Sequence, residues 1–164
     1  MKAQIGLVIR QADADDYAAI SALETHCFSD DAQSPRSLRY LLRQAHAETL
    51  LAVFGPDPAG YLSLLFRRNS RVARLYSIAV NSGYRGHGVG QGLVVAAERI
   101  ARARNLAQIR LEVRVSNRNS RRLFARLGYQ ESGQLLGYYK NRNGTTEDGV
   151  RMQKNLQKTL TAQA

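Results

Sequence analysis

The chain has 164 residues and a mass of 18.3 kDa, with 44% apolar and 23% charged residues. This size predicts one domain over 1–164 with a real core, and the balanced composition excludes a disordered chain or a disulfide scaffold. Arginine supplies 20 of the 24 basic residues, and the net charge is +11. Residues 1–57 are net −3 and residues 58–164 are net +14, so an anion site is expected in the second segment.

The sequence shows no pattern typical of a secreted, membrane or metal-binding protein. No apolar run reaches the roughly 18 residues that a bilayer crossing needs, and Met1–Asp16 has no signal-peptide pattern. Cys27 is the only cysteine, and the three histidines lack metal-ligand spacing. We therefore expect a cytoplasmic protein that holds no metal and does not bind membranes.

Helical and strand-like patterns alternate along the chain. The clearest is at Gln108–Val115, where apolar and charged residues strictly alternate. In chain order the predicted elements are a strand at Ile5–Ile9, a helix from Asp13 to Phe28, a helix from Pro35, strands at Leu50–Phe54, Tyr61–Phe66 and Leu75–Val80, a helix at Leu93–Arg104, the strand at Gln108–Val115, a helix capped within Ser116–Asn119 that ends before Gly128, and strands at Tyr129–Tyr139 and Asp148–Leu156. This order predicts an α/β fold, mixed α+β, with helices packed on a sheet.

Four glycines lie between a predicted strand and a predicted helix, at Gly86, Gly88, Gly90 and Gly92. Glycine lets a ligand approach the backbone closely, and the start of a helix presents free N–H groups and a positive dipole end. The segment is therefore predicted to hold a phosphate or pyrophosphate. The spacing fits neither the phosphate loop of nucleotide hydrolases nor the dinucleotide fingerprint. The alternative is a glycine-rich turn without a ligand.

This segment resembles the signature of the GNAT superfamily of acyl-CoA N-acyltransferases, Arg/Gln-x-x-Gly-x-Gly/Ala, over Arg85–Gly90. Further similar blocks are Tyr76–Val80, Leu111–Arg114, Ser116-Asn117, Leu127–Tyr129, Tyr138-Tyr139 and Glu147–Met152. Together they are similar to the bacterial ribosomal-protein N-terminal acetyltransferases. The resemblance covers residues 75–156, about half of the chain.

The resemblance implies a GNAT fold, with a mostly antiparallel twisted sheet of about six to seven strands and about four helices. Residues 1–74 would help to form the acceptor site, and residues 75–156 would form the acetyl-CoA-binding core. The residues implied in acetyl-CoA binding are Ile78, Ala79, Val80, Arg85, Gly86, His87, Gly88, Val89, Gly90, Gln91 and Asn117. For Asn117 a helix cap is an equally good interpretation, and the two roles are compatible.

The resemblance also implies a general base at Glu112, which would take a proton from the acceptor ammonium. The alternative is that Glu112 only balances the charges of Arg110 and Arg114 on the same strand face. Relatives carry a tyrosine as general acid at the position of Phe124, which has no proton to give. Either the thiolate leaves unassisted or Tyr138 or Tyr139 serves, although this pair is implied in acceptor binding.

The sequence therefore predicts an acetyl-CoA-dependent N-acetyltransferase, acting by direct attack in a ternary complex. The expected acceptor is a protein or peptide N-terminal α-amino group, and a small-molecule amine or polyamine is the runner-up. A basic nucleic-acid-binding domain and an acyl-CoA sensor without turnover are the other hypotheses. The sequence leaves open a monomer or a homodimer.

Overall fold

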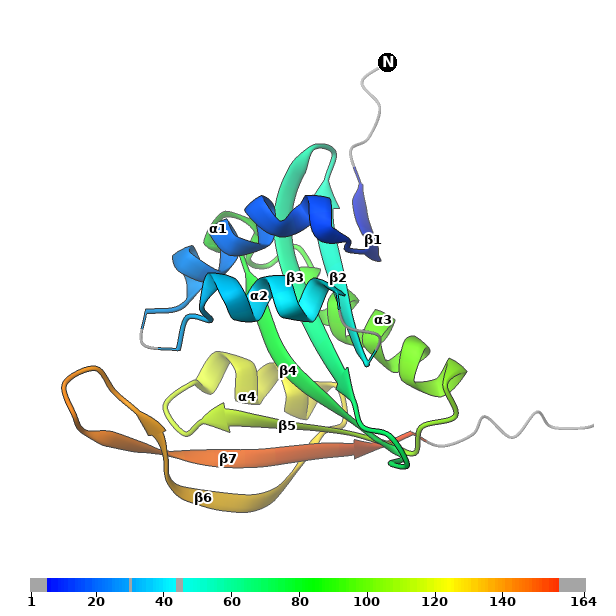
Figure 1. The fold of residues 1–164 in the computed structure, drawn as a ribbon. Helices are drawn as coiled ribbons and strands as arrows, with labels where there is room; N and C mark the ends of the chain where they lie inside the picture. The colour runs from blue at the N-terminus through cyan, green and yellow to red at the C-terminus, as the bar shows by residue number, and fades with distance from the viewer. Residues whose placement is uncertain (1–5, 30, 44–45, 157–164) are drawn as a thin grey trace, which may run out of the picture.

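Seven strands form one sheet in the order β1-β2-β3-β4-β5-β7-β6, and four α-helices flank it within the part of the chain described here (Figure 1). The computed structural model describes residues 6–29, 31–43 and 46–156. The strands are β1 (Leu7–Gln11), β2 (Ala47–Phe54), β3 (Asp57–Phe66), β4 (Val72–Val80), β5 (Gln108–Arg114), β6 (Gln130–Lys140) and β7 (Thr146–Asn155). The helices are α1 (Tyr17–Cys27), α2 (Pro35–Arg43), α3 (Val89–Ala103) and α4 (Arg118–Arg126), with short 3-10 helices η1 (Ala14–Asp16) and η2 (Ser82–Tyr84).

The predicted α/β fold, its mostly antiparallel sheet and the order of its elements are confirmed. On β5 the predicted alternation buries Ile109, Leu111 and Val113 against the core. Several elements are longer than predicted: β2, β3 and β4 begin earlier, and α3 begins at Val89 instead of Leu93. The predicted strand start at Ile5 and both ends of the predicted domain fall outside the described residues.

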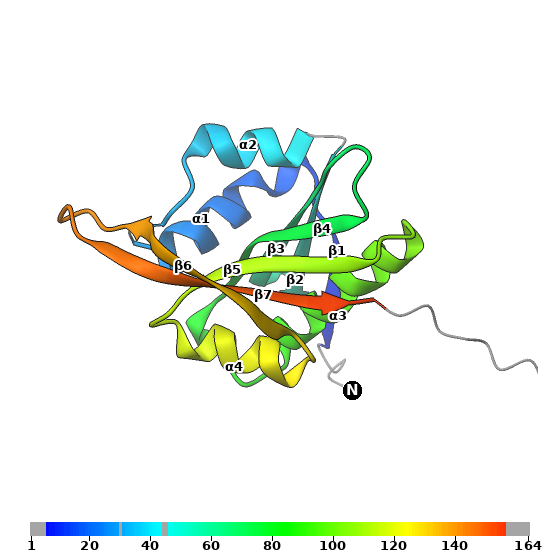
Figure 2. The same ribbon diagram turned by 90° about the horizontal axis from the view of Figure 1, so that it is seen from below.

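Helices cover both faces of the sheet (Figure 2). On one face, α1 and α2 pack their apolar residues against β2 and β3, around Ile20, Leu38 and Tyr61. On the other face, α3 and α4 bury residues such as Leu93 and Phe124. None of the helices in the described segments has the length and apolarity that a bilayer crossing requires.

One pair of neighbouring strands is parallel and short. The ladder between β4 and β5 joins only Val72–Arg74 to Gln108–Arg110, whereas the other neighbouring strands pair antiparallel over longer stretches. Beyond this ladder the two strands diverge, as Figure 1 shows. The divergence opens the sheet near its middle and positions the site described next.

Candidate functional site

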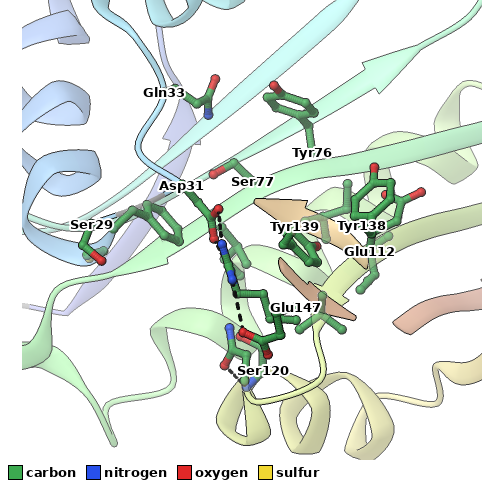
Figure 3. Close-up of a pocket in the computed structure, with 18 of the residues that line it drawn as sticks. Ser29, Asp31, Gln33, Tyr76, Ser77, Glu112, Ser120, Tyr138, Tyr139 and Glu147 are labelled. Carbon is green, nitrogen blue, oxygen red and sulfur yellow. Dashed lines mark hydrogen bonds and ion pairs between the residues drawn. The ribbon is translucent and has the colours of Figure 1, made fainter. Parts of the chain in front are cut away.

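A cleft of about 740 Å³ lies where β4 and β5 separate (Figure 3). Its walls come from α1, the segment after α1, strands β4 and β5, helix α4, strand β6 and the turn before β7. Among the predicted site residues, the cleft brings together Ile78, Glu112, Asn117, Tyr138 and Tyr139. Segments far apart in the sequence therefore meet at one opening of the sheet.

A β-bulge shapes the β4 wall of the cleft. Ser63 of β3 pairs with Ser77, and the next residue of β3, Leu64, pairs with Leu75, so Tyr76 is the extra residue. A bulge twists a strand locally and interrupts its regular pairing. Because the ladder to β5 ends at Arg74, the side of β4 that faces β5 offers backbone groups to an extended ligand.

The glycine loop ends at the start of α3. Gly86 and Gly88 have φ values of +81° and +75°, a region that glycine adopts without strain, and open space lies where their side chains would be. The first helical hydrogen bond of α3 is donated by the Gly92 N–H to the Gly88 carbonyl. The preceding N–H groups at the helix start have no intrahelical acceptor, so they and the helix dipole favour an anion.

The other two glycines of this segment, Gly90 and Gly92, have a packing role in addition. Both lie inside α3. A Cβ on Gly90 would stand 3.1 Å from Leu123 Cδ2 of α4, and one on Gly92 would stand 2.8 Å from Ile9 Cδ1 of β1. These two glycines let α3 approach α4 and β1 closely.

The loop itself is not part of the cleft lining, although the sequence groups it with the cleft residues. Gly90 also lies beside Val80, since a Cβ placed on Gly90 would stand 3.7 Å from Val80 Cγ2. The loop therefore adjoins the end of β4. The His87 ring packs edge-on against Phe54 and Tyr84, and its Nδ1 lies 3.1 Å from the Arg85 carbonyl oxygen. His87 is therefore engaged by its own loop.

Glu112 projects from β5 into the cleft, with its side chain only 7% exposed. Its Oε2 accepts a hydrogen bond from Arg74 Nε at 3.0 Å, and its Oε1 lies 3.9 Å from Arg110 Nε and 3.8 Å from Arg151 Nε. The sequence suggested Arg110 and Arg114 as neighbours. Only Arg110 is one, because Arg114 is bound to acidic groups at the other end of the cleft.

The α4 wall carries Asn117 and Phe124. Asn117 caps the helix, its Oδ1 accepting from the Ser120 N–H at 3.2 Å, and the same residue lines the cleft. The helix-cap interpretation is confirmed. Phe124 is 2% exposed and packs edge-on against Tyr129, with ring centroids 5.2 Å apart. Phe124 is thus a buried, apolar part of the wall.

Tyr138 and Tyr139 both line the cleft, with their rings edge-on and the centroids 5.0 Å apart. The Tyr138 hydroxyl accepts from Arg74 at 3.3 Å, so it lies close to Glu112 (Figure 3). Burial, aided by the neighbouring Tyr138 and Glu112, raises the pKa of Tyr139. A raised pKa makes Tyr139 a poorer proton donor.

Sequence reasoning missed an ionic cluster at the mouth of the cleft. Arg114 donates to both carboxylate oxygens of Asp31, at 2.6 and 2.7 Å, and to Glu147 at 3.1 Å and Asn141 at 2.8 Å. Figure 3 shows Asp31 and Glu147 at the two ends of these dashed interactions. The partners of Arg114 are distant from it in the chain. The alternation on β5 therefore predicts which way Arg114 faces but not which residues it binds. The cluster joins the segment after α1 to the β6–β7 hairpin.

Within residues 6–29, 31–43 and 46–156 there is no group of three His, Cys, Asp or Glu side chains that could hold a metal ion. Acidic side chains in the cleft are bound instead to arginines, as for Glu112, or to neutral donors, as for Glu24. The arrangement offers carboxylates for proton transfer and backbone N–H groups for an anion.

Residues 15–129 match the model of the acetyltransferase (GNAT) family. A protein of Bacillus subtilis (strain 168), provisionally named a ribosomal protein bS18 alanine N-acetyltransferase, is 26% identical over 144 residues, which are 88% of this chain and 92% of the relative. The structure of the ribosomal-protein-S18-alanine N-acetyltransferase from Escherichia coli has a TM-score of 0.84 at 21% identity, covering 96% of this chain and 99% of the other. Arabidopsis thaliana NAA60 in complex with acetyl-CoA has a TM-score of 0.80 at 14% identity, covering 92% and 98%.

Proposed function

The chain belongs to the acetyltransferase (GNAT) family and is an acyltransferase, and we propose that it moves an acetyl group from acetyl-CoA to the N-terminal α-amino group of a protein or peptide. The observation that carries this proposal is the opening between β4 and β5. It combines a free strand side with a carboxylate, Glu112, on the opposite wall, and the helix start suited to an anion adjoins it at the end of β4.

Acetyl-CoA suits this opening as a substrate. The N–H groups at the start of α3, over Gly86–Gln91, would hold its pyrophosphate. The backbone of Ile78–Val80 would pair with its extended pantetheine arm, as an added strand pairs with an open edge. Asn117 would contact the same arm from α4. The complex of Arabidopsis thaliana NAA60 with acetyl-CoA, in a similar fold, supports this choice.

In the proposed reaction the acceptor reaches the thioester from the side of Tyr138 and Tyr139. Glu112 takes a proton from its ammonium, and the free amine attacks the thioester carbonyl carbon. A C–N bond forms, the nitrogen loses its second excess proton, which ends in solvent water, and the C–S bond breaks. The sulfur leaves as a thiolate, because Phe124 has no proton to offer. Holding both substrates in one cleft supplies the favourable orientation.

The choice of an α-amino acceptor rests on the relatives. The Bacillus subtilis and Escherichia coli proteins are both named as alanine N-acetyltransferases of the ribosomal protein S18. The segment after α1 and the β6–β7 hairpin both line the cleft, and we place the extended peptide end along them. The high positive charge of this chain does not favour a basic protein partner, so the sequence of the acceptor is best determined by experiment.

A transfer assay with a peptide panel tests the proposal. The protein is incubated with acetyl-CoA and a peptide with a free N-terminus, the same peptide with a blocked N-terminus and one lysine, or spermidine. We expect mass spectrometry to find one acetyl group on the free α-amine only. Acetylation of spermidine alone would instead identify a small-amine acetyltransferase, and acetylation of the lysine would reject the α-amino acceptor.

A further inference from the structure

A second carboxylate of the cleft wall, Glu24 of α1, is buried without an ionic partner among the described residues. It is 2% exposed, and its carboxylate accepts hydrogen bonds from the Tyr61 hydroxyl and, at 2.9 Å, from the Gln33 N–H. The other buried glutamate, Glu98, is instead paired with Lys154 at 3.0 Å and lies 3.6 Å from Arg102. A buried carboxylate with only neutral donors is unusual, because burying an unpaired charge is costly.

Hydrogen bonds connect this carboxylate to the cleft. Tyr61 of β3 is fully buried, and its hydroxyl oxygen lies 2.9 Å from Ser77 Oγ. Ser77 stands on β4 next to the bulged Tyr76 and lines the cleft, on the side opposite Glu112 (Figure 3). Ser77, Tyr61 and Glu24 therefore form an unbroken chain of hydroxyl and carboxylate groups, which joins two residues of the cleft lining through the buried Tyr61.

The two carboxylates have different surroundings. Both oxygens of Glu112 face guanidinium groups, whereas Glu24 accepts only from neutral donors. Burial raises the pKa of Glu24, against the opposing effect of its hydrogen bonds from Tyr61 and Gln33. A base with a raised pKa accepts a proton more readily at neutral pH.

The proposed transfer requires two protons to leave the amine, so a second proton acceptor has a role in it. An ammonium nitrogen carries three hydrogens and the product amide carries one, so two protons must leave the nitrogen. With Phe124 on α4 there is no hydroxyl at that position to hand a proton to the departing sulfur. Two proton acceptors on opposite walls would let both protons leave within one turnover.

Resting on the proposed transfer to an amine, we propose that Ser77, Tyr61 and Glu24 form a proton relay that takes one of these two protons. Ser77 Oγ accepts a proton from the nitrogen as the N–H bond breaks and passes its own to the Tyr61 oxygen. Tyr61 in turn passes its proton to Glu24, which becomes a neutral carboxylic acid. Glu112 takes the other proton, the sulfur leaves as a thiolate, and both carboxylic acids later lose their protons to water.

The relay predicts a specific dependence on pH. Glu24 must be ionised to accept the proton, so turnover rises with pH as Glu24 ionises. The other titratable groups that act on Glu24 are Tyr61 of β3, Cys27 of α1 and Asp31 after α1, and Asp31 is paired with Arg114. Tyr61 keeps its proton over this range, since burial and the adjacent Glu24 raise its pKa.

Glu24→Gln and Tyr61→Phe test the relay, because each keeps the packing and removes one link. Ser63→Ala is the matched control: Ser63 is a buried hydroxyl on the same strand as Tyr61, but it is bonded to Thr49, outside the relay. The measurements are kcat from pH 6 to 9, KM for acetyl-CoA and the melting temperature, with the peptide and spermidine as acceptors.

We expect both relay variants to lower kcat about 100-fold near pH 7, with KM for acetyl-CoA within about twofold and Ser63→Ala unchanged. The loss should shrink toward pH 9, because an α-amine with a pKa of about 7.7–8.0 then loses its proton in solution. Variants whose kcat profile overlies that of the wild type, or whose loss is independent of pH and follows the melting temperature, overturn the relay. A wild-type protein inactive toward both amines would overturn the proposed function, and the relay with it.

Discussion

The carboxylate of Glu112 is surrounded by guanidinium groups from three strands. Arg74 comes from β4, Arg110 from β5 itself and Arg151 from β7, where Arg151 is the register partner of Glu112. These contacts fix the carboxylate in one position at the point where β4 and β5 begin to separate. The charge-balancing interpretation and the base interpretation therefore apply to the same residue, and only kinetics can separate them.

Glu112→Gln is expected to lower kcat about 100-fold and to leave KM for acetyl-CoA within about twofold, because the amide cannot accept the proton but keeps the shape of the side chain. Steady-state kinetics with a peptide acceptor measure both constants. Glu48→Gln is the control, since Glu48 is paired with Arg104 away from the cleft. A variant with unchanged kcat would remove Glu112 from the chemistry and leave it as a charge partner of the arginines.

At the scale of elements, helices α3 and α4 differ in how their first N–H groups are satisfied. Helix α4 begins at a side-chain cap, with Asn117 Oδ1 accepting from the Ser120 N–H. Helix α3 begins at Val89, and its cap residue Gly88 has a left-handed backbone and no side chain that could accept a hydrogen bond. The first N–H groups of α3 are therefore left for a ligand, whereas one at the start of α4 is satisfied by the protein.

Gly88→Ala is expected to lower the free energy of unfolding by about 1–2 kcal/mol, the cost of placing a side chain in the left-handed region. It should also weaken acetyl-CoA binding, because a relaxed loop turns the N–H groups of α3 away from the pyrophosphate. Denaturant unfolding and calorimetric titration measure the two effects. Gly133→Ala is the control, in open space on β6 and without positive φ, and should change neither. Equal acetyl-CoA affinity in both variants would argue against the loop as the anion site.

At the scale of the whole molecule, Arg114 connects segments that lie far apart in the sequence on either side of the cleft. Its ion pairs join Asp31, after α1, to Glu147 at the start of β7, and Arg142 adds a 2.7 Å hydrogen bond to the Ser29 carbonyl. The Ser116 hydroxyl and N–H, with Arg114, lower the pKa of Glu147. Because a lowered pKa stabilises the fold above the ordinary range of glutamate, this contribution is lost only as the pH falls through the lowered value.

Arg114→Lys is expected to raise KM for the peptide acceptor several-fold, since lysine cannot form the two-pronged contact with Asp31. Affinity for acetyl-CoA should stay the same, because its proposed contacts lie on β4, α3 and α4. Arg121→Lys is a matched control, since Arg121 also donates twice to one carboxylate, Glu131, on the outside of α4. If the two substitutions change the acceptor KM equally, the cluster has no part in acceptor binding.

The sequence could predict those features that depend on residues close to one another in the chain. The alternation at Gln108–Val115, the proline that opens α2 and the cap at Asn117 depend on a few neighbouring residues, and the structure confirms them. The separate uses of Gly88 and Gly90 could not be predicted, because only the approach of α4 to α3 distinguishes them. The partners of Arg114 and the link from Glu24 to Ser77 depend on long-range packing, so no pattern in the sequence indicates them.

The binding of acetyl-CoA tests the central claim most directly, through thermal unfolding with acetyl-CoA, with RNA and with neither. At about 100 times its Kd, acetyl-CoA should stabilise the fold by about 2.7 kcal/mol, whereas RNA should have no comparable effect at physiological salt. That result would support the opening between β4 and β5, with the start of α3, as the donor site. No stabilisation by acetyl-CoA, together with a salt-sensitive stabilisation by RNA, would contradict it.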